Sequence, residues 1–409
     1  MGAIVKKEII ANLLSDRFFM VIGLTTLLLA ISLFVMSRDF KDRLADFQLN
    51  QPKTGESVAV IPPNPLSIFA KGLDEAMTRS FEINKTGIYV QTGRQSGNVI
   101  FSFFPSPDFV YIVKIVLSLV ALLFGFDQIS REREQGTLKL MLANPLSRAS
   151  VLAGKWLGNY LSLVIPFLLV TLLGIAVLGM DPAIRLPAAG VGRLALLIAT
   201  SCVYIALFLS LGLFISAFTR RSATSLVVLL FIWSLLVFIL PNLGTLFARQ
   251  CVELPSVRAL REKQQQILTR EILLSYSDKT SVDAHIRTAV DEYGRLEEDY
   301  HHKFDDLVRL SKAVNRISPA ASFVFAATEI AGTGIGEESS LKKDILRYKS
   351  RIQEDIRSGT AIHAAFAYRY RSVGRVLAEG GLFDLAWLFL FTIGFIAAGY
   401  AAILRYDVR

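Results

Sequence analysis

The sequence has little cysteine and little charge, and each shortage excludes a class of protein. Its 409 residues contain only two cysteines, Cys202 and Cys251, whereas a disulfide-stabilised fold needs more cysteines in close array. Charged residues make up 19% of the chain, against about 25% in an average soluble domain. Hydrophobic residues reach 53%, and the mean hydropathy is +0.47. These proportions are typical of a membrane protein.

Nucleotide-binding motifs and ion relays are also missing. The chain has no Gly-x-x-x-x-Gly-Lys-Ser/Thr sequence, whose backbone N–H groups would cradle phosphates. The run from Gly332 to Gly336 lacks dinucleotide-binding spacing and is predicted to be a flexible joint. Apart from Lys114 and Asp384, the apolar stretches hold almost no ionisable residues, and ion-coupled carriers need such relays. We therefore expect no cofactor in this chain and an energy source outside the bilayer.

The basic residues do not gather on one face, although the net charge is +9. Lys and Arg lie beside apolar stretches, a pattern that sets membrane orientation and does not indicate nucleic-acid binding. The histidines all fall in one polar region, where a solvated helix face explains them as well as a metal site does. They are His285, His301, His302 and His363. We expect neither a metal site nor catalytic residues.

Apolar residues are concentrated in runs of the length that crosses a bilayer. About 18–25 residues in a helix span a hydrocarbon core of about 30 Å. Six such spans are predicted, at 18–36, 109–126, 157–179, 194–218, 223–243 and 382–404. The predicted fold class is therefore mainly α, with a polytopic six-helix transmembrane domain.

Two long polar regions separate spans and are predicted to form outer domains. Region 37–108 contains prolines, glycines and short strand-prone runs at Ile88–Gln91 and Val99–Phe104, so we expect a mixed α/β domain. Region 244–381 is predicted to be helical. Within it, apolar residues recur every three or four positions from Ile286 to Ile317, as on one face of a long helix.

The helical region contains further predicted elements. Helices over Leu254–Tyr276 and Leu341–Leu377 would complete a hairpin or bundle with the long helix. Residues Ala320–Ala331 are apolar but too short to cross a bilayer, and they are expected to rest on its surface.

The N-terminal residues 1–17 are predicted to form an amphipathic helix at the membrane interface. Val5, Ile9 and Leu13 recur at helical spacing among charged residues. The alternative is the charged lead of a signal peptide, but no small-residue cleavage site follows Met36.

The short loops decide the expected orientation, because long domains escape the positive-inside rule. Lys and Arg are frequent in residues 1–17, the 127–156 loop, the 220–222 turn and the tail 405–409. With six spans, all four of these segments fall on one side, and loop 180–192 falls on the other. We therefore predict a multi-pass protein of the cell (inner) membrane with both termini in the cytoplasm.

The segment 127–156 has the most informative pattern. Charges of opposite sign alternate from Arg131 to Glu134, Gly136 breaks the polar run, and an apolar face follows. Pro145 ends that element, and Ser147 is a suitable N-cap for the helix leading into the third span. Such an element, braced between two membrane helices, suits docking onto a soluble protein. A solvated loop with capped ends would carry the same residues.

This segment resembles the signature of the ABC-2 membrane family, the permeases of type-2 ABC exporters. The resemblance is carried by Asp127, Glu132, Glu134, Gly136, Thr137, Leu138, Pro145, Ser147, Arg148, Gly154 and Lys155. More loosely it extends to the membrane plan, with an amphipathic N-terminal helix and six spans. The two sizeable outer domains resemble those of a larger subgroup of that family.

The resemblance implies a non-enzymatic permease that works with other chains. Two permease subunits, identical or related, would pair, and each would meet an ATP-binding cassette ATPase that binds ATP and Mg²⁺. The outer domains would act on cargo or on periplasmic or other envelope proteins. The residues implied in coupling to the ATPase are Asp127, Arg131, Glu132, Arg133, Glu134, Gly136, Thr137 and Leu138. Structural roles beside this segment are implied for Pro145, Ser147, Arg148 and Lys155.

Two alternatives belong to other functional classes. A non-transporting membrane scaffold, whose outer domains bind envelope partners, would have no ATPase partner and would tolerate changes at Glu132, Glu134 and Gly136. An ion-coupled carrier or channel would need polar residues along a path, which the predicted spans lack.

Overall fold

The computed structural model describes residues 1–51, 58–78, 80–84, 87–91, 107–143, 147–277, 282–358 and 366–405. The chain forms two compact units. Unit 1 comprises Met1–Val237 and Pro319–Arg409, and unit 2 comprises Phe238–Ser318. The predicted outer domain 244–381 is thus divided, because its second half packs with the membrane helices.

Six helices in the described residues are long and apolar enough to cross a membrane, which confirms the mainly helical class with six spans. They are Phe18–Leu49, Phe109–Glu134, Arg148–Gly179, Ala188–Phe218, Ser222–Cys251 and Val373–Leu404. Their elements are α2 (Asp16–Leu49), α5 (Phe109–Ile112), η2 (Val113–Leu117), α6 (Ser118–Gly125), α7 (Ser130–Glu134), α9 (Arg148–Gly179), α10 (Ala188–Phe218), α11 (Ser222–Ser234), η3 (Leu235–Ile239), α12 (Leu240–Cys251), α17 (Val373–Val376), η4 (Leu377–Gly381) and α18 (Leu382–Leu404).

The first span helix continues well past Met36, where the apolar run ends. Ser15 caps the start of α2, because its side chain accepts a hydrogen bond from the Phe18 N–H at 3.3 Å. Beyond Met36, Phe40 is buried and Leu44 is partly buried against the core of unit 1. These two residues, four positions apart, lie on one helix face, so the charged residues around them mark the exit from lipid rather than the end of the helix.

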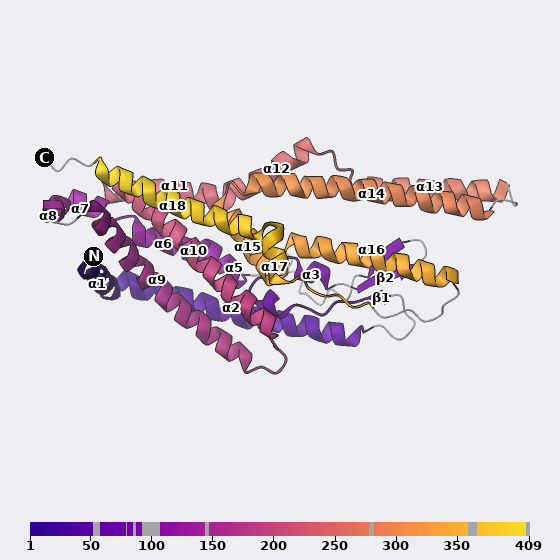
Figure 1. Ribbon diagram of the computed structural model, residues 1–409, viewed down its shortest axis with the longest axis horizontal. Helices are drawn as coiled ribbons and strands as arrows, with labels where there is room; N and C mark the ends of the chain where they lie inside the picture. Colours follow the sequence, from indigo (N-terminus) through magenta and orange to yellow (C-terminus); the bar gives the residue numbers. More distant parts are fainter. Residues whose placement is uncertain are drawn as a thin grey trace. The chain divides into compact units, whose positions relative to one another are not determined.

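α10 lies at the centre of unit 1 and packs against α6, α9, α15 (Pro319–Ala331) and α18. Figure 1 shows α9, α10 and α18 running alongside one another, with α1 and the C-terminal end of α18 at the same end of unit 1. α6 and α10 approach most closely at two glycines. A Cβ added to Gly125 would lie 2.9 Å from the Gly212 Cα, so this crossing has no room for a side chain.

α15 does not rest on the bilayer surface as expected. It is buried against α10 and α18, and the Phe323 ring stacks on that of Tyr204 with 4.2 Å between centroids. Packing against these helices removes its apolar face from water as completely as lipid would.

The region between the first two spans is not a separate mixed α/β domain. Its described residues form η1 (Pro65–Ile68), α3 (Asp74–Met77) and a small antiparallel sheet of β1 (Val58–Ala59), β2 (Ser80–Asn84) and β3 (Gly87–Gln91). Ala59 pairs with Phe81, which pairs with Val90. Ala59, Ile61 and Met77 share a core with Leu341 and Ile345 of α16 (Ile335–Ser358), so the region belongs to unit 1. The predicted strand Val99–Phe104 lies outside the described residues.

Unit 2 consists of α12 and a hairpin of α13 (Val257–Ser277) and α14 (Val282–Asn315). Polar contacts join the two long helices: Arg270 Nη2 lies 2.6 Å from Glu292 Oε2 in an ion pair, and His285 Nδ1 lies 3.0 Å from Glu271 Oε2. The predicted helix Leu341–Leu377 is shorter in the structure, because α16 ends at Ser358 and residues 366–372 are not helical.

Candidate functional site

The segment after the second span folds as two short helices joined by a tight turn. α7 ends at Glu134, and α8 (Thr137–Ala143) begins after Gly136. Gly136 has φ +73°, and nothing lies within 4 Å of a Cβ added there. Glycine is therefore needed for the left-handed backbone and not for space. The Thr137 hydroxyl donates a hydrogen bond back to the Glu132 carbonyl at 3.3 Å.

Lys155 of α9 connects this segment to the N-terminal helix. Its side chain is 3% exposed, and its Nζ lies 2.8 Å from Glu132 Oε1 and 3.1 Å from Glu8 Oε1. Glu8 belongs to α1 (Gly2–Leu13) and is also buried. Lys7 Nζ lies 4.0 Å from the same Glu132 oxygen. We call Glu8, Lys155 and Glu132 the Lys155 cluster.

Two glycines let α1 approach α9 closely around this cluster. A Cβ on Gly154 would lie 2.9 Å from the Ile4 Cγ2, and one on Gly158 would lie 2.6 Å from the Glu8 Cβ. α1 is therefore packed against protein, and this contact buries Glu8, one of the charged residues of the predicted amphipathic helix. The sequence signal for this contact was a pair of glycines four positions apart, one on each side of Lys155, because small residues at this spacing permit close helix contact.

The other charged residues of α7 contact the turn between α10 and α11. Glu134 Oε2 accepts hydrogen bonds from the Ser222 N–H at 3.3 Å and the Ser222 hydroxyl at 3.1 Å. Arg133 Nη1 donates to the Thr219 carbonyl at 3.1 Å. Just before α7, the Ser216 hydroxyl accepts from the N–H groups of residues 129 and 130. The segment is thus joined to α1, α9, α10 and α11.

The remaining predicted residues divide between exposed and buried positions. Arg131, Gly136 and Thr137 are exposed, as is Glu134 despite its contact with Ser222, and Arg131 Nη1 lies 3.9 Å from Asp127 Oδ2. Leu138 is buried. An exposed stretch thus alternates with residues that anchor it to the membrane helices.

The residues predicted to support the segment lie at the start of α9. Ser147 caps α9 by accepting a hydrogen bond from the Ser150 N–H at 3.2 Å. Arg148 Nη1 donates to the carbonyls of Ile403 at 3.0 Å and Leu404 at 2.7 Å, at the end of α18. Pro145 lies outside the described residues.

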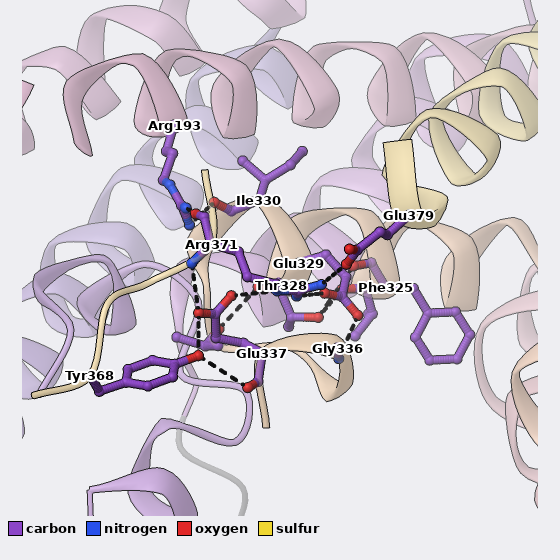
Figure 2. A network of polar contacts seen from close by, with 12 residues as sticks. Arg193, Phe325, Thr328, Glu329, Ile330, Gly336, Glu337, Tyr368, Arg371 and Glu379 are labelled. Carbon is purple, nitrogen blue, oxygen red and sulfur yellow. Dashed lines mark hydrogen bonds and ion pairs between the residues drawn. The ribbon is translucent and has the colours of Figure 1, made fainter. Parts of the chain in front are cut away.

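A second polar site, which the sequence analysis did not find, surrounds Arg371 (Figure 2). The guanidinium of this buried residue contacts three carboxylates: Nε lies 2.9 Å from Glu337, Nη2 2.7 Å from Glu329, and Nη1 2.7 Å from Glu379. Burial alone would lower the pKa of Arg371, but its hydrogen bonds to Glu337, Glu329 and Glu379 raise it. We call these four residues the Arg371 network.

The Arg371 network joins several elements of unit 1. Glu329 comes from α15, Glu337 from α16 and Glu379 from the turn η4 that leads into α18. Arg193 of α10 donates to the carbonyls of Ile330, at 3.3 Å, and Arg371. Figure 2 shows the Tyr368 hydroxyl beside Glu337, where it donates to Oε1 at 2.7 Å. The network thus connects the helices α10, α15, α16 and α18.

An ion pair extends this polar region to the first span. Asp74 of α3 is fully buried and pairs with Arg43 of α2, which also donates to the Ser67 hydroxyl at 3.1 Å. Burial raises the pKa of Asp74, and Arg43 opposes that rise. The Asn64 amide donates to the Ala331 carbonyl at 2.8 Å, which ties this region to α15.

Comparison with known proteins identifies the family. The model of the ABC-2 family transporter proteins matches residues 2–408. The chain belongs to the ABC-2 family. It is therefore a multi-pass membrane permease subunit, and its two polar sites lie on a permease scaffold.

Two curated relatives of this chain share one name. The chain is 34% identical over 150 residues to the "Probable ABC transporter permease protein NosY" of Pseudomonas aeruginosa, covering 34% of this chain and 52% of that protein. It is 32% identical over 96 residues to the NosY protein of Stutzerimonas stutzeri, covering 23% of this chain and 35% of that protein. The chain thus matches about half of the first ABC-2 relative and about a third of the second.

Proposed function

We propose that this ABC-2 permease couples ATP hydrolysis, in a separate ATP-binding cassette subunit, to export or to force transmission toward its outer regions. One observation carries the proposal: the α7–α8 segment exposes Arg131, Gly136 and Thr137 while Glu132 and Glu134 anchor it to other helices. A segment with this arrangement can bind a soluble subunit and pass its displacement to the membrane helices.

The contacts of Glu132 and Glu134 give two routes by which a displacement of the α7–α8 segment can reach the membrane helices. Glu132 acts through Lys155 on α9 and through Glu8 on α1. Glu134 and Arg133 act on the turn between α10 and α11. Buried charged pairs and packed helices transmit displacement because they have few alternative arrangements.

At the other end of α10, the Arg371 network connects this helix to α15, α16 and α18. A shift of α10 against α18 would therefore reach α16, which packs with β1 and α3 of the first outer region. This continuous path through unit 1 supports a mechanical role as well as export.

The proposal includes the other chains and the orientation. ATP and Mg²⁺ would be bound by the ATPase, and a second permease subunit, identical or related, would complete the transporter. The basic short loops favour the inner membrane with both termini in the cytoplasm. The outer regions would then contact cargo or envelope proteins, and no nucleic acid is involved.

The test is to purify the tagged chain from its native membrane in mild detergent, beside a Glu134→Arg variant. We expect an ATP-binding cassette subunit to co-purify with the wild type, and the variant to lose it or to release ATP hydrolysis from permease control. The change breaks the contact with Ser222 and places a cation beside Arg133.

The control is Glu262→Arg in α13, an equal charge reversal at a side chain that is 62% exposed. Exposed ion pairs contribute about 0–1 kcal/mol, so this variant should keep the ATPase. If the wild type brings no ATP-binding subunit in several detergents, the proposed coupling is wrong and a non-transporting scaffold replaces it.

A further inference from the structure

An apolar groove of about 490 Å³ lies between α9, α10 and α18. Its size is within the range of about 300–1,000 Å³ seen for ligand pockets. Small residues create the space, since Ala149 and Ala153 line it from α9 and Ala397 and Gly399 line it from α18. Leu213 and Phe214 of α10 contribute to its lining.

The lining of the groove suits an apolar ligand. Two of its polar lining groups are already engaged, because the Trp156 indole N–H donates to the Ser210 hydroxyl at 2.8 Å, and this hydroxyl donates to the Ala206 carbonyl at 2.7 Å. An unfilled apolar hollow among membrane helices would lose dispersion contacts on every wall. A hydrocarbon chain restores those contacts and leaves the hydrogen bonds of Trp156 and Ser210 intact.

The groove lies near one boundary of the membrane. Its lining residues come from the start of α9, which begins at Arg148, from the last turns of α10, and from residues 393–400 in the second half of α18. This is the end of unit 1 where α1 and the C-terminal end of α18 lie (Figure 1). A chain entering the groove from this boundary would leave its polar head beside the helix ends.

Two arginines lie beside the helix ends at which a lipid chain would enter the groove. Arg148 is one helical turn before Leu152 and two before Trp156, so it lies on the groove face of α9. Its described hydrogen bonds, to the carbonyls of Ile403 and Leu404, engage only Nη1 of a group with five N–H donors. Arg405, which directly follows Leu404, is exposed.

We propose that the groove binds one acyl chain of an anionic phospholipid, whose phosphate is bound by Arg148 and Arg405. Cationic sites between membrane helices near a bilayer surface attract such headgroups. The bound lipid would bridge the start of α9 and the end of α18. This site does not depend on the proposed ATP coupling, because it needs only the membrane helices.

The test uses the full-length permease in vesicles of phosphatidylcholine containing phosphatidylglycerol with a photoreactive acyl chain. After irradiation, mass spectrometry should locate the label on peptides containing residues 149–157 and 393–400. Ala153→Trp, which fills the groove, should reduce that labelling at least threefold. Ala397→Phe gives the same test from α18. The matched control is Leu173→Trp, also in α9, at a residue that is 68% exposed and does not line the groove.

The headgroup is tested by Arg148→Gln in vesicles with the photoreactive chain on either phospholipid. The wild type should be labelled several-fold more by phosphatidylglycerol, and the variant should lose this preference. Labelling that is uniform over the exposed helix faces, or unchanged by both groove-filling variants, would overturn the proposal. So would a cross-link from a photoreactive residue at position 397 to a second copy, because a protein would then occupy the groove. Size-exclusion profiles matching the wild type would show that the variants fold.

Discussion

Lys155 and Glu8 are 147 positions apart in the chain, yet the lysine Nζ and the glutamate Oε1 are 3.1 Å apart in a buried site. Glu132 contacts the same Nζ, so one cation lies between two carboxylates. Lys155 thereby holds α1, α7 and α9 together at the point where the permease is proposed to receive movement from its ATPase.

Replacing Lys155 with methionine should destabilise the permease. The change leaves Glu8 buried beside Glu132 with no cation between them, and removing one partner of a buried ion pair typically costs about 3–5 kcal/mol. We expect a fall in the thermal unfolding midpoint of several degrees, measured by tryptophan fluorescence in detergent.

Lys7→Met is the matched control. The Lys7 side chain is 66% exposed, and its Nζ makes a longer contact, of 4.0 Å, with Glu132 Oε1. It should change the midpoint little. Adding Glu8→Gln to Lys155→Met should recover part of the loss by removing one uncompensated charge. Equal midpoints for the two methionine variants would show that the buried contact does not stabilise this packing.

Much of the membrane plan could be predicted because the bilayer restricts what can cross it. Spanning segments must satisfy their backbone groups internally and must be apolar over about 20 residues, and six such helices are present. The apolar stripe from Ile286 to Ile317 likewise predicted a long helix close to the observed α14.

The anchoring contacts could not be predicted, because they depend on how the helices pack. Glu8 has the sequence context of an exposed residue, and only the approach of α1 to Gly158 buries it. The Arg371 network is even harder to predict from the sequence, since Glu329, Glu337 and Glu379 become neighbours only when α15, α16 and η4 pack together. Charge and periodicity are local, whereas these contacts are not.

Arg371 should be needed for the stability of the part of unit 1 that contains α15 and α16. Arg371→Gln removes the cation that three glutamates share, so it leaves Glu337 and Glu329 buried without compensation. We expect a loss of about 3–5 kcal/mol and faster hydrogen exchange in α15 and α16. Arg371→Lys should rescue little, because an ammonium cannot reproduce a planar fork of five donors.

The control for this charge is Arg375→Gln in α17, at an exposed position four residues away. It should leave exchange in α15 and α16 unchanged. If Arg371→Gln and Arg375→Gln gave the same exchange rates, the network would be an incidental contact rather than a structural joint.

Gly136 should tolerate asparagine better than alanine. Its φ of +73° strains any residue with a Cβ, at a cost of about 1–2 kcal/mol, and asparagine adopts this region more readily than alanine. Gly136→Ala should therefore lower the free energy of unfolding and weaken ATPase binding, and Gly136→Asn should do so less. Gly294→Ala within α14 should have the opposite sign, because alanine is favoured over glycine in a helix by about 1 kcal/mol.

The crossing of α6 and α10 should not tolerate a side chain at either of its glycines. A Cβ added to Gly212 would lie 3.0 Å from the Gly125 Cα, and backbone atoms cannot rotate away as a side chain can. Gly212→Ala must therefore separate the two helices, with an overpacking cost of about 1–3 kcal/mol. Gly394→Ala in α18, where nothing lies within 4 Å of the added Cβ, should instead be neutral or stabilising. Thermal unfolding of both variants in the same detergent distinguishes a steric effect from the general preference for alanine in helices. Because α6 leads directly into α7, a separation here should also disrupt the proposed coupling to ATP hydrolysis even in protein that remains folded, whereas Gly394→Ala should leave that coupling unchanged.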